Sequence, residues 1–406
     1  MHNLSRLALR NLLRNRVRTL ITLAAIMFGV CGLILSGGFV RDIFVQLGEA
    51  LIHSQSGHVQ IGQEAVFTHG SRTPEQYLIE EHAALRKQVG ALPQVKDVMG
   101  RIAFSGLLNN GRTDYPILAE GVEPGRENAL GTHLHLVAGR TLRDDDRFGA
   151  MIGEGVASAL RLAPGDQATL LVSTIDGAMN TLDIEVVGVF QTFSKDFDAR
   201  AVRIALPDAQ DLLATTGVSR LVLALHDTAS TQTVVDTLRP LLAAQGLSVR
   251  DWMALNDFYG KTVELYRQQF GFLKGMVLLM VCLSVINTVN MSLVERSWEF
   301  GTMRALGNST RTVASLIIGE SAALGFVGAT GGTLLGVGLA VLISGVGIPM
   351  PPPPNADLGY DAFIRIVPSV VAESWLIGLS ATVVAALYPA WRLSRLSIIG
   401  ALRTRE

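Results

Sequence analysis

Four long stretches of this 406-residue chain contain no charged residue. The stretches are Thr19–Val40 (22 residues), Gly275–Val294 (20 residues), Ser321–Ala356 (36 residues) and Ser374–Trp391 (18 residues). The hydrocarbon core of a bilayer is about 30 Å thick, and an α-helix crosses it in roughly 20 apolar residues. Trp375, Tyr388 and Trp391 lie at the ends of the last stretch, where interfacial aromatic residues are expected. The pattern therefore predicts four transmembrane helices.

The third stretch is too long for a single span, and it contains four consecutive prolines, Pro351–Pro354. Proline has no N–H to donate and favours the polyproline II conformation, so these residues belong to a loop outside the hydrocarbon. Apolar character already begins near Thr312. The third helix is therefore predicted over residues 312–345, with a break or a tilt at its glycines as an open alternative.

Basic residues indicate how the four helices are oriented. Residues 1–18, 295–311 and 392–406 together carry 12 basic and three acidic residues, a net charge of +9, whereas the whole chain has a net charge of −1. The loop between the third and fourth helices has a single base, Arg365. By the positive-inside rule, both termini and the connection between the second and third helices lie in the cytoplasm, and residues 41–269 lie outside.

The first apolar stretch also has features of a secretory signal peptide, because a basic segment precedes it and Ser36-Gly37-Gly38 are small. The apolar part of a signal peptide is normally about 7–15 residues long, whereas this stretch has 22. We therefore predict an uncleaved transmembrane helix.

The segment 41–269 has a different pattern, in which β-branched or alternating runs are separated by turn residues. Strands are predicted at Gly57–Ile61, Val95–Phe104, Tyr115–Gly121, Ala168–Ser173, Asp183–Phe190 and Arg220–His226. Helices are predicted at Pro74–Gly90, Gly155–Leu162 and Thr231–Gln245. Asn109-Asn110-Gly111 and Ile175-Asp176-Gly177 are suited to hairpin turns, because Asn, Asp and Gly tolerate positive φ. An α+β domain of two or three small subdomains is expected.

Both ends of this segment carry a helical pattern. Asp42–His53 continues the first membrane helix, and Trp252–Phe272 leads into the second, each with apolar residues at near-helical spacing. Both read as stalks that lengthen the membrane helices into the domain. A stalk can transmit motion or can simply pack, and the pattern does not decide between the two.

Composition narrows the functional class. Hydrophobic residues make up 49% of the chain and charged residues only 17%, which argues for a membrane protein and against disorder. The balance of 34 Lys+Arg against 35 Asp+Glu gives no basic excess for nucleic acid. Cys31 and Cys282, the two cysteines, lie in apolar stretches, so a disulfide framework or a Cys-based zinc site is excluded.

Two motifs imitate functional sites without completing them. Gly260-Lys261-Thr262 resembles the end of a phosphate-binding loop, but Leu255 stands where that motif requires Gly. His133 and His135 would share one face of a strand, but no nearby Cys or acidic pair completes a metal set. We therefore expect no catalytic, cofactor-binding or metal-binding residue on this chain.

Two features of the third helix point to contacts inside the membrane. Gly328, Gly332 and Gly336 recur every four residues, and small residues on one face allow helices to approach closely in lipid. Their partner is either another permease subunit or another helix of this chain. Glu320 is an acid within the span, where it is expected to face a cavity or a partner, for instance Arg304 or Arg311.

The connection Glu295–Gly307 reads ERSWEFGTMRALG. It is close to the pattern E-R-x-x-E-[IF]-G-x-x-[RK]-A-[LIM]-G. With Ala8–Thr19 and Pro389–Arg403 at its two ends, the chain resembles the ABC transporter permeases of the MacB/LolC/FtsX type. The middle segment is most similar to that of the lipoprotein-releasing (LolC/LolE-like) permeases, in the motifs Gly57–Ile61, Gly153–Ala157 and Val187–Phe190.

The resemblance implies a permease that forms a dimer with a second copy or a related permease. It also implies a separate cytoplasmic ATP-binding subunit, which would carry ATP and Mg²⁺ while this chain carries no cofactor. The Glu295–Gly307 connection would be the coupling helix to that subunit. The positions that match the family there are Glu299, Phe300, Gly301, Arg304, Ala305 and Gly307.

The leading function implied by the resemblance is ATP-driven movement of the periplasmic domain that extracts lipoproteins from the inner membrane for transfer to the outer membrane. A periplasmic lipoprotein carrier or adaptor would then be a further partner. Efflux of small hydrophobic compounds or peptides, as in MacB-like systems, is one alternative. Mechanical regulation of a periplasmic partner, as in FtsX-like members, is another.

The expected fold class is an α-helical membrane protein with one helix before, and three helices after, a large extracytoplasmic α+β domain. The expected parts are a cytoplasmic amphipathic segment (1–18), transmembrane helix 1 (19–40), a periplasmic domain with stalks (41–269), transmembrane helix 2 (270–294), a coupling helix (295–311), transmembrane helix 3 (312–345), a Pro-rich periplasmic loop (346–371), transmembrane helix 4 (372–391) and a cytoplasmic tail (392–406).

Overall fold

The structure is a computed structural model that describes residues 16–68, 77–131, 134–192, 194–351 and 359–394. The chain divides into two compact units. The helical unit comprises residues 1–44, 263–349 and 361–406, and the sheet unit comprises residues 45–262 and 350–360. The predicted segment 1–18 lies mostly, the tail 392–406 largely and the Pro-rich loop partly outside the described residues.

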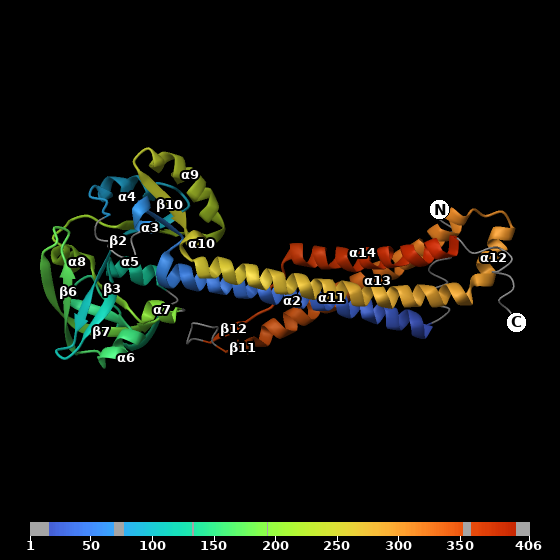
Figure 1. The fold of residues 1–406 in the computed structure, drawn as a ribbon, viewed down its shortest axis with the longest axis horizontal. Coiled ribbons are helices and arrows are strands. Elements are labelled where there is room, and N and C mark those ends of the chain that lie inside the picture. The colour runs from blue at the N-terminus through green and yellow to red at the C-terminus, as the bar shows by residue number, and fades with distance from the viewer. Residues whose placement is uncertain (1–15, 69–76, 132–133, 193, 352–358, 395–406) are drawn as a thin grey trace. The chain divides into compact units, whose positions relative to one another are not determined.

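Four long helices dominate the helical unit (Figure 1). They are α2 (Arg16–Leu51), α11 (Asp257–Glu295), α13 (Thr310–Val346) and α14 (Pro368–Ser394). Each is long and apolar enough to cross a membrane. The hydroxyl of Ser309 caps the start of α13 by accepting from the Thr312 N–H at 3.2 Å. Because α13 is one uninterrupted helix, the suggested break at its glycines is not found.

Shorter elements connect these helices. The helix α12 (Ser297–Ala305) lies between α11 and α13, and the two-stranded sheet of β11 (Ile348–Met350) and β12 (Tyr360–Ala362) borders the prolines. The predicted second stalk is divided, because α10 (Trp252–Leu255) is separated by Asn256 from α11, which begins at Asp257. The first stalk is continuous with α2 up to Leu51 and ends in the π-helical turn η1 (Ile52–Ser56).

The larger part of the sheet unit is a closed ring of strands. Its strands are β2 (Val95–Asn109), β3 (Asp114–Val122), β5 (Gly149–Gly153), β6 (Gln167–Ser173), β7 (Met179–Gln191) and β8 (Ala201–Ala205). Pairing runs β2-β3-β8-β5-β7-β6 and returns to β2. Such closure forms a barrel and leaves no free edge within the ring. The strand β4 (His135–Gly139) adds to β7 outside it.

A second, smaller sheet shares the long strand β2 with the barrel. Only the first half of β2 pairs with β9 (Arg220–Leu225), which is followed by β1 (Val59–Gln63) and β10 (Leu247–Asp251). The helix α4 (His82–Gly90) packs on β2, and α9 (Thr231–Ala243) packs on β10. The expected α+β domain of small subdomains is therefore present.

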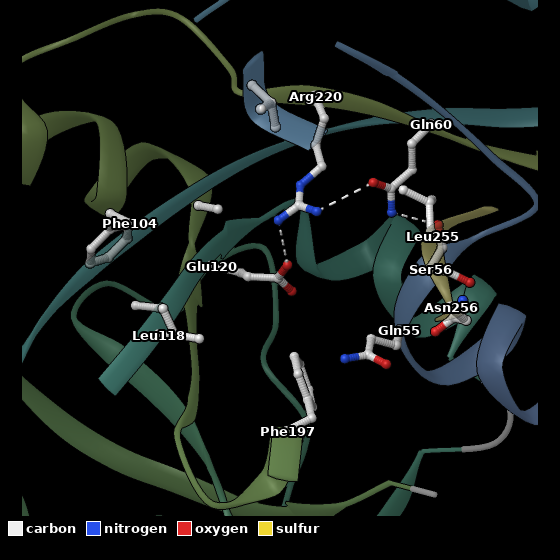
Figure 2. Close-up of a pocket in the computed structure, with 13 residues that line it drawn as sticks. Gln55, Ser56, Gln60, Phe104, Leu118, Glu120, Phe197, Arg220, Leu255 and Asn256 are labelled. Carbon is white, nitrogen blue, oxygen red and sulfur yellow. Dashed lines mark hydrogen bonds and ion pairs between the residues drawn. The ribbon is translucent and has the colours of Figure 1, made fainter. Parts of the chain in front are cut away.

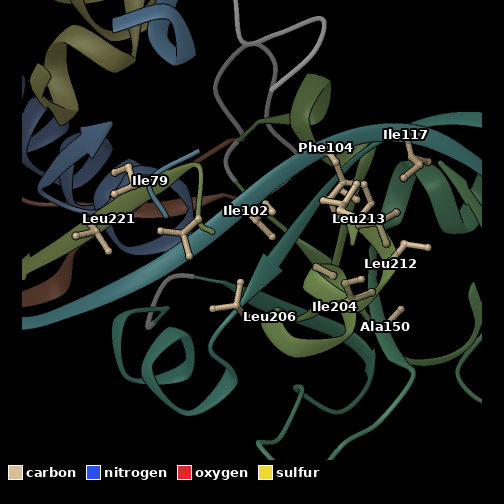
Figure 3. Close-up of a cluster of buried hydrophobic side chains, with 14 of the residues drawn as sticks. Ile79, Ile102, Phe104, Ile117, Ala150, Ile204, Leu206, Leu212, Leu213 and Leu221 are labelled. Atoms are coloured by element: carbon tan, nitrogen blue, oxygen red, sulfur yellow. The ribbon is translucent and has the colours of Figure 1, made fainter. Parts of the chain in front are cut away.

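The remaining short elements lie between these strands. They are α3 (Glu64–Thr68), α5 (Pro124–Leu130), α6 (Glu154–Leu160), α7 (Lys195–Asp198), α8 (Leu206–Leu213) and the 3-10 turn η3 (Thr228–Ser230). The core of the barrel is mostly aliphatic but includes Phe104, which like Ile204 is essentially inaccessible to solvent, and Leu212 packs into it from α8 (Figure 3).

Most of the predicted local elements are confirmed. All six predicted strands exist, and Gly111 and Gly177 take positive φ at the two predicted hairpin turns. The strands β4, β5, β8 and β10 were missed. The predicted helix Pro74–Gly90 is wrong over Tyr77–Glu81, because the helix begins only at His82.

Candidate functional site

Within the connection between α11 and α13, Arg296 links α12 to α13. The guanidinium of Arg296 donates from Nε to Glu299 Oε2 at 2.9 Å and from Nη1 to Glu320 Oε1 and Oε2 at 3.0 and 2.9 Å. It also lies 5.1 Å from the centre of the Phe300 ring. Burial opposes the charge of Arg296, but the two carboxylates outweigh burial and raise the pKa of Arg296. Arg296 is therefore a partner of Glu320, a pairing that the sequence did not suggest.

The same connection presents some residues outward and keeps others inside. Phe300 is 2% exposed and packs among the buried residues of the helical unit, with Gly301 buried beside it. Trp298 and Leu306, by contrast, are 51% and 79% exposed. Of the other candidate coupling residues, Glu299 and Arg304 are half-buried, and Ala305 and Gly307 are exposed. The exposed apolar surface here thus includes Trp298 on α12 and Leu306 directly after it, whereas Phe300 anchors the helix.

The glycines of α13 lie against α2 of the same chain. An added Cβ would approach Ile26 Cγ2 to 2.8 Å at Gly328, the Met27 carbonyl oxygen to 2.7 Å at Gly332, and Ile34 Cβ to 3.2 Å at Gly336. Only glycine leaves room for so close a contact. The structure therefore assigns these three glycines a partner within this chain.

Asp42 is a buried acid whose role the local sequence does not reveal. It is 1% exposed on α2, and its carboxylate accepts from the Phe363 N–H and from Arg365 Nε, both at 2.8 Å. Arg365 N–H also donates to the Gly38 carbonyl oxygen at 3.3 Å. Arg365, the one base of the loop before α14, thus pairs with Asp42, the acid that follows the first uncharged stretch. The two residues lie 323 positions apart in the sequence, so no local pattern reveals the pairing.

The sheet unit contains a cavity of about 260 Å³ with one polar and one apolar wall (Figure 2). Glu120 extends into it, with Oε1 accepting from Arg220 Nη2 at 3.2 Å. Arg220 Nη1 also donates to Gln60 Oε1 at 3.3 Å. Phe104 and Phe197 line the apolar wall. Burial disfavours the Glu120 carboxylate, but Arg101, Arg220 and Arg203 outweigh it and lower the pKa of Glu120.

Two other buried groups of the sheet unit have shifted ionisation. His58 accepts from the Leu225 N–H through Nδ1 at 3.3 Å and contacts Thr228 Oγ1 through Nε2 at 3.2 Å, and burial lowers the pKa of His58 to about 4. Asp198 accepts from the N–H and the hydroxyl of Thr192, both at 2.8 Å, and burial raises the pKa of Asp198 to about 6. His58 is therefore neutral at pH 7.

The motifs that were set aside gain no support from the structure. Gly260 and Lys261 belong to α11, whereas a phosphate-binding loop must be a loop. His135 lies on the strand β4, and His133 lies outside the described residues. No three His, Cys, Asp or Glu side chains form a metal-binding group within the part of the chain that the structure describes.

Two protein families match the chain over most of its length. The profile of the MacB-like periplasmic core domain matches residues 19–241, and that of the FtsX-like permease C-terminal domain matches residues 271–398. The chain is 24% identical to the lipoprotein-releasing system transmembrane protein LolC of Xylella fastidiosa over 77% of this chain and 78% of that protein. It is 23% identical to the macrolide export ATP-binding/permease protein MacB of Hyphomonas neptunium over 98% of this chain and 60% of that protein.

Among solved structures, the periplasmic region of MacB from Actinobacillus actinomycetemcomitans matches with a TM-score of 0.37 and 14% identity. The match covers 52% of this chain and 94% of that structure.

Proposed function

The chain belongs to the MacB/FtsX-type permeases of ABC transporters, and on that premise we propose that it drives movement of its sheet unit by coupling to ATP hydrolysis, in order to extract lipoproteins from the inner membrane. As a permease subunit it leaves hydrolysis to a separate ATP-binding subunit. The chain is a multi-pass membrane protein with four candidate spans. We further propose that ATP and Mg²⁺ are bound by the partner and that this chain carries no cofactor.

Lipoprotein extraction is supported by the similarity to LolC, which extends over most of both chains. The second candidate function is efflux. It is supported by the similarity to the macrolide export protein MacB, which covers 98% of this chain. Both candidates use a dimer with a second copy or a related permease. They differ in the partner outside, which is a lipoprotein carrier in the first case and an efflux adaptor in the second.

The orientation that we propose places both termini and α12 in the cytoplasm. It is supported by the net charge of +9 on residues 1–18, 295–311 and 392–406. The sheet unit then lies in the periplasm and α12 faces the compartment that holds ATP.

The observation that carries the proposal is the division of α12 into an inner and an outer face. Arg296 and Phe300 fix the helix to the rest of the unit, while Trp298 on the helix and Leu306 directly after it remain exposed, outside the four spans. An exposed aromatic and an exposed leucine beside a half-buried Arg304 suit a small interface with another protein. We propose that the outer face binds the ATP-binding subunit.

The variants Leu306→Asp and Arg304→Glu test this interface. Each should abolish co-purification of the ATP-binding subunit in mild detergent, whereas Leu306→Met and Arg304→Lys should retain it. The thermal stability of the purified chain should be the same in all four variants. Undiminished recovery of the ATP-binding subunit with Leu306→Asp and with Arg304→Glu would remove α12 from the interface.

A pulldown of the tagged chain from its native membrane separates the two substrates. Recovery of an ATP-binding subunit with acylated lipoproteins supports extraction and shows whether the second permease is a copy or a relative. Recovery with an adaptor protein instead supports efflux. Recovery without any ATP-binding subunit contradicts the coupling mechanism.

A further inference from the structure

The helix formed by α2 and η1 ends inside the sheet unit. Its last carbonyl groups have no partner within the helix, which is the general condition of a helix C-terminus. The chain leaves the helix at Gly57, whose N–H donates to the Ile52 carbonyl oxygen at 2.9 Å across the π-helical turn. Gly57 has φ +65°, and an added Cβ would lie 2.3 Å from Val222 Cγ1. The chain therefore leaves the helix at a glycine that packs closely against Val222 on β9.

The backbone carbonyl groups of the three residues before Gly57 each accept a hydrogen bond from a buried side chain. The bonds join Arg203 Nη2 to Ser54 O (2.9 Å), Arg101 Nη1 to Gln55 O (2.5 Å) and Gln60 Nε2 to Ser56 O (2.7 Å). The three donors come from three different strands, β8, β2 and β1. We call this group of three donors the carbonyl clamp.

The arginines of the carbonyl clamp are themselves held. Arg101 makes a two-pronged pair with Glu127, at 2.5 Å from Nε to Oε1 and 2.9 Å from Nη2 to Oε2. Glu120 lies directly opposite Arg203 in the β3–β8 pairing, and its Oε2 is 3.7 Å from Arg203 Nε and 3.9 Å from Arg101 Nη1. Arg101 and Arg203 are 1% and 4% exposed. The guanidinium groups therefore have little freedom to move away from the helix end.

Two physical terms favour this arrangement. A positive charge at a helix C-terminus interacts favourably with the partial negative charge of the last carbonyls. A hydrogen bond from a charged donor is also stronger than one from a neutral donor, and losing it in a buried site leaves a polar group unsatisfied. The cost of burying two guanidinium groups is offset only while Glu120, Glu127 and the carbonyls stay in place.

We infer that Arg101, Arg203 and Gln60 are positioning residues. They connect the end of the α2–η1 helix rigidly to the strands β1, β2 and β8, so that these elements move together. The helix end also contacts Thr228 through Glu49 at 2.8 Å and the Leu130 carbonyl oxygen through His53 at 2.9 Å, but neither of these partners belongs to β1, β2 or β8. Through the carbonyl clamp, a displacement of the helix end moves both the barrel and the smaller sheet. The inference rests on the proposed function, because a rigid connection of this kind has a role only if the helix is displaced.

The first test concerns the carbonyl clamp alone, in the full chain in lipid nanodiscs. Arg203→Lys and Glu127→Gln should accelerate amide hydrogen exchange of residues 52–58 by about tenfold or more, because each weakens a charged hydrogen bond. Arg86→Lys is the matched control, since Arg86 also pairs with a glutamate, Glu123, and also donates to a carbonyl, but that carbonyl belongs to Val98 on a strand. Unchanged exchange of residues 52–58 in both variants would overturn the inference.

The second test concerns transmission, in the complex with the ATP-binding subunit. Spin labels at Met179 and Val346, which are 66% and 90% exposed and belong to different units, report ATP-driven movement once Cys282 is replaced by Ser. The ATP-driven change in distance should be lost in Arg203→Lys at temperatures where the variant stays folded, while ATP hydrolysis matches that of Arg86→Lys. A merely structural residue would leave the movement of the folded protein intact.

The outcomes of the two tests are distinct. Faster exchange with an undiminished movement in Arg203→Lys would show that the carbonyl clamp only stabilises, and would overturn the positioning role. No ATP-driven movement in the unmodified chain would instead contradict the proposed function, and the exchange measurement would still decide whether the carbonyl clamp holds the helix end.

Discussion

The two units of this protein achieve close packing with opposite kinds of residue. In the helical unit the tightest approaches are at glycines, as where Gly332 on α13 meets the backbone of α2 at Met27. In the sheet unit the interior is filled by large side chains such as Phe104, Ile102 and Leu108. The helical unit also exposes many large apolar side chains, among them Phe272 and Leu342.

This difference follows from the solvent that each unit is built for. In water, burying apolar surface is the main favourable term, so large side chains gather inside. In lipid, apolar side chains gain nothing by leaving the surface, and helices associate through close contact and a few hydrogen bonds. Substitutions that change volume, charge or hydrogen bonding should therefore have different effects in the two units.

Removal of a large side chain from the sheet unit should have the largest effect. Phe104→Ala removes a ring that is 1% exposed and should lower the free energy of unfolding by about 3–5 kcal/mol. Met179→Ala, at a residue that is 66% exposed, should change it by less than about 0.5 kcal/mol. Thermal unfolding of the purified full chain in detergent measures both. Equal effects at the two positions would contradict the description of this core.

The buried charges of the sheet unit should give two opposed pH dependences. Because the pKa of His58 falls from 6.5 to about 4, the unfolded chain binds more protons there, and stability rises with pH between about 4 and 6.5. Because the pKa of Asp198 rises from 3.8 to about 6, stability falls with pH between about 4 and 6. Each shift corresponds to about 3 kcal/mol, so the two nearly cancel.

Single substitutions should uncover each contribution. His58→Gln should make the protein less stable at pH 6 than at pH 4, and Asp198→Asn should make it more stable at pH 6 than at pH 4. Thermal unfolding at a series of pH values measures both slopes, with the exposed His226→Gln as control. Parallel pH curves for the two variants would show that the opposed shifts do not exist.

Addition of volume should be costly at one glycine of α13 and harmless at another. Gly332→Leu places a Cβ 2.7 Å from the Met27 carbonyl oxygen, and since backbone cannot yield easily, we expect a loss near the upper end of the about 1–3 kcal/mol typical of overpacking. An added Cβ at Gly338, on the same helix, meets nothing within 4 Å. Size-exclusion profiles of detergent extracts should show loss of folded protein only for Gly332→Leu.

Loss of a hydrogen bond between the membrane helices should have the smallest effect. Thr22 on α2 and Thr288 on α11 are joined through their hydroxyl groups at 2.6 Å. Such bonds in lipid contribute about 0.6 kcal/mol on average, so Thr288→Val should barely change the thermal stability. A double-mutant cycle with Thr22→Val isolates the bond, and a coupling energy above about 2 kcal/mol would show that polar contacts, rather than close packing, hold these helices.

The elements of the fold followed from the sequence to the extent that local pattern specifies them. The four uncharged stretches led directly to four helices, because length and apolarity are sufficient evidence for a span. The strands β5 and β8 were missed, since Gly149–Gly153 begins and ends in glycine and Ala201–Ala205 is short with an arginine at its centre. Their place in the ring comes from pairing with distant strands, which no local window records.

The candidate site was predictable in part for the same reason. The connection Glu295–Gly307 is recognisable from its residues, but the sequence does not predict that Phe300 lies inside, because nine residues of helix are too few to define a buried face. The link between Arg296 and Glu320 depends on how α11, α12 and α13 pack. The carbonyl clamp was invisible, because its acceptors are backbone groups and every residue has one.

The closed ring of strands has a consequence for the order in which the chain can fold during synthesis. The ring needs β8, the last of its strands in the chain, to join β3 to β5. Within the described residues, the strand β1, which follows shortly after η1, pairs with β9 and β10, and these are the last strands made in the segment 45–262. The barrel can therefore close while β1 still waits unpaired, so newly made chains should pass through an intermediate that a chaperone could recognise by its open strand edge.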